Sequence, residues 1–289
     1  MTADEVAAAG RMPLGARVHL AHALVQRLAS DAGVDLLHLK GPALLPDLRP
    51  PGRHSSDVDV LVRPGHLARL VVALESTGWE QRTDFATGSV FAHAANWWHD
   101  DWGWVDVHVT WPGVTIAPDR AYDVLAGSGV VHDIAHVPCL VPDRIGQLLV
   151  LVLHSARSVG SNEAEFAWSR ADGSEQAAVR GLAATLGAEV ALAAGLGELE
   201  NFRDHPTYAL WRHVSTGGSR LDEWRARLAA APTAQARAHL LADVLRVNRD
   251  HLRMELGHAP TRQELRRRQA VRLRRAAREI ARLGRRGRA

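Results

Sequence analysis

The stretch HSSDVDVLV, residues 54–62, decides how the first half of this chain is interpreted. Its apolar residues predict a short β-strand, although aspartate is depleted from strands. Side chains alternate between the two faces of a strand, so the three valines point into a core and Asp57 and Asp59 share the opposite face. A carboxylate that is buried on such a face needs a partner. The stretch therefore raises the question of what the two aspartates bind.

A second stretch, WVDVHVTW at residues 104–111, repeats this alternation. Its three valines form one face, and Asp106 and His108 lie on the other. If the two strands are neighbours in one sheet, Asp57, Asp59 and Asp106 form a cluster of three carboxylates. The pattern thus predicts an acidic site built from two separate strands.

Three adjacent carboxylates repel one another and require a counter-ion. Oxygen ligands with few histidines favour Mg²⁺ or Mn²⁺ over zinc. A pair of such ions is a common device for phosphoryl or nucleotidyl transfer, in which one carboxylate accepts the proton of the attacking group. The alternative interpretation is the solvated face of an edge strand, without any metal.

The composition sets wide bounds on the class of protein. A chain of 289 residues with 46% hydrophobic and 23% charged residues is typical of one large or two ordinary globular domains. Its single cysteine, Cys139, excludes an internal disulfide and a cysteine-based zinc site. The longest apolar run, at 148–153, is far shorter than the ~20 residues that span a bilayer, and the first residues do not resemble a signal peptide. We expect a soluble cytoplasmic protein with no membrane span.

The order of apolar patterns divides the chain into two parts. The first, 1–141, mixes strands and helices: helices are predicted at 16–29, from Pro42 and at 64–77, and strands at 34–40, 57–62, 90–96 and 104–110. The second, 142–289, shows helical patterns only. His154 lies in one of these helices among apolar residues, which is typical of a core histidine. Thr261 and Glu264 form a capping box that opens a last helix over 262–283.

Three stretches together resemble a known family: LLHLKGPALLPDL, RHSSDVDVLVRPGHLARLVVALESTGW and WVDVHVTW. The chain is similar to the uncharacterised nucleotidyltransferase family within the DNA polymerase β-like superfamily. That family has Leu-Lys-Gly after a strand, then Arg-x-x-Ser-Asp-x-Asp-x-Leu-Val, then an acidic residue two before a histidine. The match covers residues 34–111. It implies an α+β fold, with a small mixed sheet of polymerase-β nucleotidyltransferase type and helices, followed by an all-helical domain.

The resemblance also implies roles for individual residues. Asp57 and Asp59 would bind the catalytic metals, Mg²⁺ or Mn²⁺, and Asp106 would complete the metal set and act as the general base. His108 would orient Asp106 or a phosphate of the substrate. The residues expected to approach the triphosphate of a bound NTP are Lys40, Gly41, Arg53, Ser55, Ser56 and His108.

One position departs from the wider superfamily, which has Gly-Ser at the first turn where this chain has Gly41 and Pro42. Proline offers neither a hydroxyl nor an N–H group to a phosphate. Lys40, the only lysine of the chain, or Arg53 would compensate as a charged phosphate ligand.

The expected activity is transfer of a nucleoside monophosphate from an NTP, such as ATP, to an acceptor, with release of pyrophosphate. The acceptor is open: a small molecule, a peptide or protein, or an RNA end. The alternative is a catalytically inert, nucleotidyltransferase-like binding module. It would recruit an anionic partner through the C-terminal helix.

The basic residues gather at the C-terminal end. Residues 262–289 contain twelve arginines and two glutamates, a local charge of +10, so the other residues carry 3 − 10 = −7. An arginine-rich helix of this kind suggests an anionic partner, RNA or an acidic peptide. A solvated basic tail is the competing interpretation.

Overall fold

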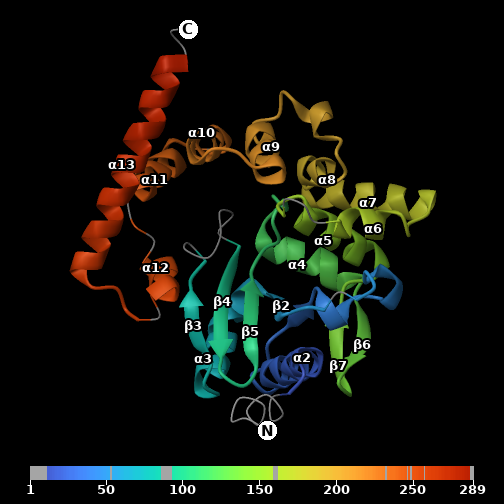
Figure 1. Ribbon diagram of the computed structural model, residues 1–289. Coiled ribbons are helices and arrows are strands. Elements are labelled where there is room, and N and C mark those ends of the chain that lie inside the picture. Colours follow the sequence, from blue (N-terminus) through green and yellow to red (C-terminus); the bar gives the residue numbers. More distant parts are fainter. Residues whose placement is uncertain are drawn as a thin grey trace.

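The two acidic strands are neighbours at the centre of one sheet (Figure 1). The computed structural model describes residues 12–52, 54–85, 93–158, 162–231, 233–245, 247, 249–256 and 258–286, so Arg53 lies outside the described residues. The strands of this sheet are β1 (Leu36–His38), β2 (Asp57–Val62), β3 (Glu80–Thr83), β4 (Ala94–His99) and β5 (Gly103–His108), in the order β1-β2-β5-β4-β3. β2 and β5 are parallel, and the other pairs are antiparallel.

One face of the sheet forms a hydrophobic core with two helices, α2 (Leu14–Asp31) and α3 (Leu67–Ser76). The valines of β2 and β5 point to this face and are fully buried together with Leu70 and Leu74 of α3. The predicted alternation is therefore confirmed: the valines face one core, and the acidic side chains lie on the other face.

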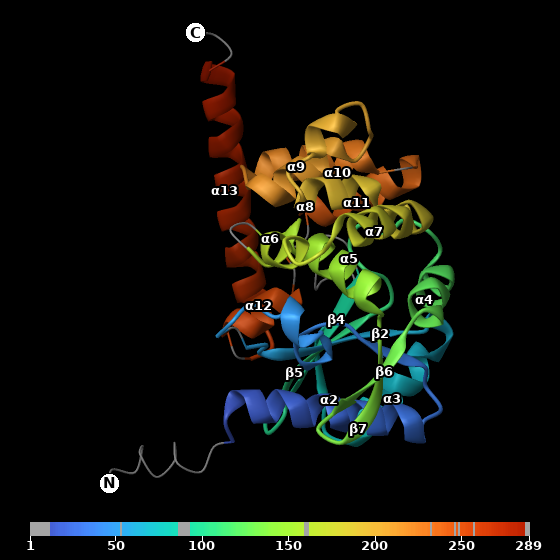
Figure 2. The same ribbon diagram turned by 90° about the vertical axis from the view of Figure 1, so that its right-hand side faces the viewer.

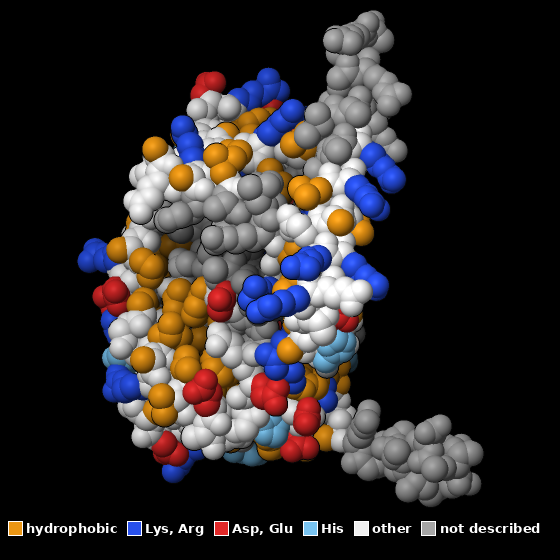
Figure 3. Space-filling model, turned by 90° about the vertical axis from the view of Figure 1, so that its left-hand side faces the viewer, with side chains coloured by type: hydrophobic (Ala, Val, Ile, Leu, Met, Phe, Trp, Pro, Cys, Tyr) orange, Lys and Arg blue, Asp and Glu red, His pale blue; other side chains and the backbone are white. Residues whose placement is uncertain are grey.

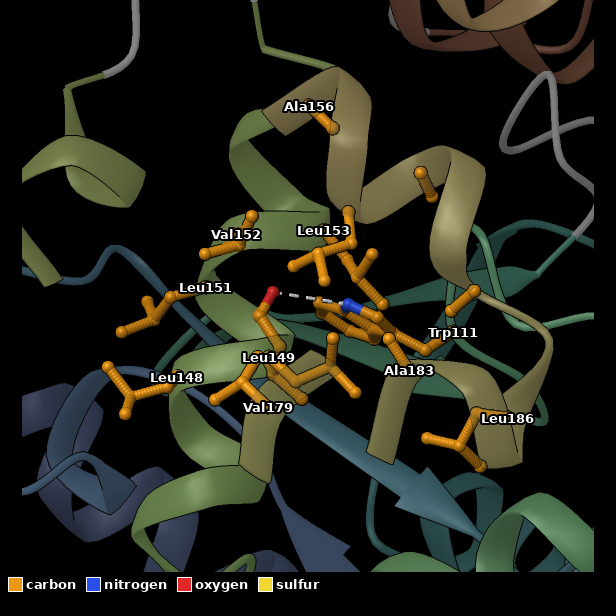
Figure 4. Close-up of a cluster of buried hydrophobic side chains, with 14 of the residues drawn as sticks. Trp111, Leu148, Leu149, Leu151, Val152, Leu153, Ala156, Val179, Ala183 and Leu186 are labelled. Carbon is orange, nitrogen blue, oxygen red and sulfur yellow. Dashed lines mark hydrogen bonds between the residues drawn. The ribbon is translucent and has the colours of Figure 1, made fainter. Parts of the chain in front are cut away.

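The opposite face of the sheet packs against the helices that follow it. Trp111, just after β5, is buried beside α5 (Arg144–Ser155) and donates a hydrogen bond from Nε1 to the Val150 carbonyl at 3.3 Å (Figure 4). Leu37 of β1 and Leu61 of β2 belong to the same cluster. Residues from both parts of the chain thus share one hydrophobic core.

Between β5 and α5 the chain forms helix α4 (Pro118–Gly127) and a hairpin of β6 (Val130–Ile134) and β7 (Val137–Val141). The Asp143 side chain caps the start of α5 by accepting the Gly146 N–H at 2.8 Å. The elements that follow α5 are α6 (Glu163–Trp168), α7 (Gly173–Leu186), α8 (Glu189–Gly195), η4 (Leu199–Phe202), α9 (Tyr208–Thr216), α10 (Arg220–Ala230), α11 (Ala234–Leu245), α12 (Arg249–Leu256) and α13 (Arg262–Arg286).

Some elements differ from the prediction. The segment after Lys40 is not a helix but two 3₁₀ turns, η1 (Gly41–Ala43) and η2 (Pro46–Leu48), because extended residues and Pro46 interrupt the helical pattern. The predicted helix at 64–77 begins with a third 3₁₀ turn, η3 (Pro64–His66), before α3. β4 begins later than predicted, and the start of its predicted range, 90–92, lies outside the described residues.

The last helix, α13, lies along one side of the molecule (Figures 1 and 2). The predicted capping box is present: the Thr261 N–H donates to Glu264 Oε2 at 2.8 Å, and the Glu264 N–H donates to Thr261 Oγ1 at 3.3 Å. Arginine side chains gather on this helix, where Val271 and Leu273 are also exposed (Figure 3). Among the described residues, no helix combines the length and apolar character that a bilayer span requires.

Candidate active site

The register of the sheet brings the predicted carboxylates together. Across the parallel pair, Asp59 of β2 lies opposite Asp106 of β5, and Asp57 precedes Asp59 on the same face. Ligand atoms of Asp59, Asp106 and His108 all lie within 4.8 Å of one another. Two strands that are distant in sequence therefore build one acidic centre.

Asp59 is the buried member of this centre, with 2% of its side chain exposed. Its Oδ2 lies 2.8 Å from Lys40 Nζ, and its Oδ1 accepts a hydrogen bond from His108 Nε2 at 3.0 Å. Burial alone would raise the pKa of Asp59, but the Lys40 ammonium and the His108 hydrogen bond outweigh burial and lower it. Asp59 is thus an ionised carboxylate with both oxygens already in contact with donors.

Asp106 has a different environment. Its Oδ1 accepts a hydrogen bond from the side-chain amide of Asn96, the residue opposite it on β4, and the Asn96 oxygen accepts one from Thr83. Burial and the negative charge of Asp59 raise the pKa of Asp106 to about 7. His108 was predicted to orient Asp106 or a phosphate. In the structure His108 contacts Asp59, and Asn96 holds Asp106; a contact of His108 with a phosphate stays a prediction.

Asp57 lies at the start of β2, half-buried. The Ser55 hydroxyl is 3.1 Å from Asp57 Oδ1 and 2.9 Å from its carbonyl oxygen. Burial, and then the charge of Asp59, raise the pKa of Asp57. Asp57 and Asp106 are therefore the two carboxylates of the centre that have neutral hydrogen-bond partners.

A cavity of about 300 Å³ opens beside Asp57. Four predicted triphosphate ligands line it, Lys40, Gly41, Ser55 and Ser56, together with His154 and Glu163 of the helical part. Gly41 has a φ of +62°, and a Cβ there would lie 2.9 Å from the Ser55 Cβ. Only glycine lets the two turns approach this closely.

The helical part contributes side chains that sequence reasoning missed. Arg157 follows α5 and donates a hydrogen bond from Nη1 to His93 Nε2 at 3.0 Å. Its guanidinium carbon is 5.7 Å from the Trp111 ring centroid, and Lys40 Nζ is 5.8 Å from the same centroid. Burial lowers the pKa of Arg157, and the nearby Asp59 and Asp106 charges partly offset this effect. Nothing in the local sequence distinguishes Arg157 from the other arginines of the chain.

His154 was predicted to be a core histidine, and this prediction is wrong in part. It lies in the last turn of α5, half-buried at the cavity, with Nδ1 3.1 Å from Glu163 Oε2. Burial lowers its pKa, although the Glu163 hydrogen bond opposes this shift. The cavity therefore lies between the turns that flank β1 and β2, the start of α2, and the helices α5 and α6.

The donor set fits a divalent cation. Carboxylate oxygens with one imidazole nearby suit Mg²⁺ or Mn²⁺. Burial, and then the Asp59 charge, raise the pKa values of Asp57 and Asp106, and a bound cation would oppose both shifts. The predicted ligands of the ion are Asp57, Asp59 and Asp106, and in the structure the ligand atoms of Asp59 and Asp106 lie within 4.8 Å of each other and of His108.

Comparison with known proteins assigns the family. Residues 16–169 match the family described as uncharacterised nucleotidyltransferase, which is more than half of the 289 residues. The chain belongs to this family, as its motifs predicted, and it is a nucleotidyl-transfer enzyme with the expected α+β fold. No curated protein matches the chain in sequence.

Three solved structures show a distant likeness. The lincomycin-bound crystal structure of the lincosamide antibiotic adenylyltransferase LnuA has 14% identity and a TM-score of 0.35, covering 51% of this chain and 94% of that one. The solution structure of the antibiotic-resistance factor ANT(2'')-Ia has 16% identity and a TM-score of 0.39, with coverages of 68% and 95%. An antigenic nucleotidyltransferase-like protein from Paracoccidioides brasiliensis has 14% identity and a TM-score of 0.35, with coverages of 71% and 95%. No substrate follows from likenesses this distant.

Proposed function

We propose that this enzyme transfers a nucleoside monophosphate from an NTP to an acceptor, with Mg²⁺ or Mn²⁺ and with release of pyrophosphate. The observation that carries the proposal is the register of β2 and β5, in which Asp59 lies beside Asp106 next to the cavity at Asp57. A carboxylate cluster beside a cavity with serine hydroxyls and a glycine turn suits a metal-neutralised triphosphate.

In the proposed reaction, an oxygen or nitrogen atom of the acceptor attacks the α-phosphorus. The bond from that phosphorus to the bridging oxygen of the β-phosphate breaks, and pyrophosphate leaves with the electron pair. The divalent ion, when bound, neutralises charge on the triphosphate. Asp106 takes the proton of the acceptor: burial and the Asp59 charge raise its pKa, and the Asn96 amide holds its carboxylate in place.

Lys40, Gly41, Ser55, Ser56 and Arg53 are the proposed triphosphate ligands. To these we add Arg157. No aspartate or glutamate of the described residues forms an ion pair with its guanidinium, which lies between the carboxylate centre and the helices. This half-buried guanidinium stays charged, and an anion beside it would stabilise that charge. The phosphates of a nucleotide would supply that anion. Arg157 would then replace the phosphate contact that Pro42, without a hydroxyl or an N–H group, cannot make.

Three classes of acceptor are compatible with this reaction: a small molecule, a peptide or protein side chain, and an RNA end. The arginines of α13 support an anionic partner, RNA or an acidic peptide, because a helix with so many cations attracts phosphate or carboxylate groups. A steep dependence of RNA affinity on salt concentration would support the RNA form of this partner. The absence of any RNA binding would remove it.

The direct test measures nucleotide binding and turnover together. The purified protein is heated with ATP, GTP, CTP or UTP in Mg²⁺ and in EDTA, and α-labelled NTP is used to detect pyrophosphate release and labelled product from an acceptor mixture. A ligand at about 100 times its dissociation constant stabilises the fold by about 2.7 kcal/mol. We expect a Mg²⁺-dependent shift with at least one nucleotide, lost in Asp57→Asn/Asp59→Asn.

The matched control is Asp101→Asn, which changes an exposed aspartate in the turn between β4 and β5. It should respond to nucleotide like the wild type. A wild type that shows neither a shift nor turnover with any NTP would contradict the proposal and favour the inert binding module.

A further inference from the structure

One carboxylate of the centre, Asp59, already forms an ion pair with a side chain of the protein, Lys40. Lys40 Nζ lies 2.8 Å from Asp59 Oδ2, and the two side chains are 15% and 2% exposed. We propose that Lys40 takes the place of one divalent cation, so that its ammonium stays on Asp59 during nucleotide binding and the centre binds a single metal ion. This inference rests on the proposed function.

The backbone fixes this arrangement. The Leu39 N–H donates to the Asp59 carbonyl at 3.0 Å, so the residue before Lys40 is tied to the strand position that carries the carboxylate. The second oxygen of Asp59 is held by His108 at 3.0 Å, and His108 is itself 1% exposed. Both Asp59 oxygens therefore already lie beside a positively charged or N–H-bearing group of the chain, Lys40 on one and His108 on the other.

The other two carboxylates lack such a cation. The Asp57 carboxylate accepts a hydrogen bond from the Ser55 hydroxyl, and that of Asp106 accepts one from the Asn96 amide, and both of these partners are neutral. Of the described ion pairs, none includes Asp57 or Asp106. One divalent ion at this centre, together with the Lys40 ammonium on Asp59, would balance the three carboxylate charges with three positive charges.

The ammonium can also do what a metal ion does in such a centre. It has three N–H donors, and contact with one carboxylate oxygen leaves others that can bind a phosphate oxygen. Lys40 lines the cavity where the triphosphate is proposed to bind, and the Trp111 ring lies 5.8 Å from its nitrogen. A cation over an aromatic ring is stabilised as a charge. Lys40 would thus bridge Asp59 and a phosphate.

The first test uses the fact that Lys40 is the only lysine in the sequence. Protein labelled with ¹⁵N and ¹³C in lysine alone gives one lysine side-chain NMR signal. We expect a protected, ion-paired ammonium that is lost in Asp59→Asn and that persists when Mg²⁺ and a non-hydrolysable NTP analogue are added. If the signal moves on their addition to that of a freely solvated lysine, the inference is wrong.

The second test counts metal ions. Titration with Mn²⁺ in the presence of the NTP analogue, followed by electron paramagnetic resonance, should give one bound ion in the wild type and in Lys40→Arg. Lys40→Met should bind two ions, because the Asp59 oxygen that Lys40 contacts is then open to a metal ion. Lys40→Met leaves the buried Asp59 carboxylate without its cation, so the fold of this variant is checked by circular dichroism. The NMR test uses the wild type and does not depend on whether this variant folds.

The outcomes separate this inference from the proposed function. Two Mn²⁺ ions in the wild type with the analogue bound would overturn the role of Lys40 and leave the nucleotidyltransferase proposal in place. A wild type that binds neither Mn²⁺ nor the analogue would overturn both. One ion in the wild type and two in Lys40→Met would support both.

Discussion

The Arg157 guanidinium carbon lies 5.7 Å from the centroid of the Trp111 ring. Trp111 follows the strand that carries Asp106, and Arg157 follows α5, so this contact joins the acidic strand to the helical part of the enzyme. The charges of Asp59 and Asp106 both act on the guanidinium. The helices therefore reach the carboxylate centre with a cation and do not merely cover the sheet.

Replacing Arg157 should impair catalysis more than stability. For Arg157→Met we expect kcat/KM for the NTP to fall by roughly 10²-fold, because removal of one preorganised donor at a reacting group typically costs this much. Steady-state kinetics with the donor that the nucleotide screen selects would measure it. Arg157→Lys keeps the charge and should recover part of the loss. If Arg157→Met has wild-type kinetics, Arg157 has a structural role only.

Asn96 should act as a positioning residue for Asp106. Asn96→Ala removes the amide that holds Asp106 Oδ1, and we expect activity to fall by about 10- to 100-fold, the usual cost of losing such a support. The KM for the NTP should change little, because Asn96 does not line the cavity. Gln81→Ala on the adjacent strand β3 is the control, since among the described residues its amide donates to the Thr83 carbonyl and not to Asp106. Equal activity of the two variants would refute this role.

The turn at Gly41 should tolerate no side chain. Gly41→Ala places a Cβ 2.9 Å from the Ser55 Cβ in a backbone with φ of +62°. We expect a loss of about 2–3 kcal/mol in the free energy of unfolding, from the left-handed backbone and from the clash. Gly52→Ala separates these two causes, because Gly52 has a φ of +72° and nothing within 4 Å of an added Cβ. It should lose only about 1 kcal/mol in urea unfolding. If Gly41→Ala and Gly52→Ala lose the same free energy of unfolding, the contact between the added Cβ and Ser55 has no measurable cost.

Two buried histidines should make the fold sensitive to acid. Burial lowers the pKa of His22 to about 3 and that of His93 to about 2, so both are neutral when folded. In the unfolded chain their pKa is near 6.5. Below that pH the unfolded state binds more protons, so the stability falls as the pH is lowered toward 3.

For His22 alone the loss at pH 5 is about 2 kcal/mol, at ~1.4 kcal/mol for each pH unit below 6.5. Urea unfolding between pH 7.5 and 5 should show a smaller slope with pH for His22→Asn than for the wild type. His136→Asn, an exposed position with a φ of 64°, should keep the wild-type slope. The explanation is wrong if His22→Asn keeps that slope as well.

The carboxylates were predictable because alternation along a strand is a local property. Asp57, Asp59 and Asp106 could be placed on one face from the sequence, and the valines between them fixed the other face. The edge strand β3, with sequence EQRT, was not predicted, since polar residues at a sheet edge have no apolar period. Its Thr83 supports Asn96, and so the chain of contacts to Asp106 was missed as well.

Contacts between distant segments were not predictable. Lys40 was expected to bind a phosphate, and its ion pair with Asp59 depends on how the turn after β1 packs against β2. Arg157, His154 and Glu163 reach the site through the packing of α5 on Trp111, which no short motif encodes. For the same reason His154 was mistaken for a core residue.

The core shared by Trp111, Leu61 and α5 has a consequence for how this enzyme can change over time. The strand with Asp106 is followed closely by Trp111, which the helices bury. Neither the sheet nor the helical part can therefore be replaced by that of another protein unless this core is rebuilt. A substitution inside α5 could alter nucleotide chemistry while touching no substrate atom. The family motif and the helical part should therefore be inherited as one unit. Substitutions that adapt the enzyme to a new acceptor should leave Trp111 and its packing unchanged.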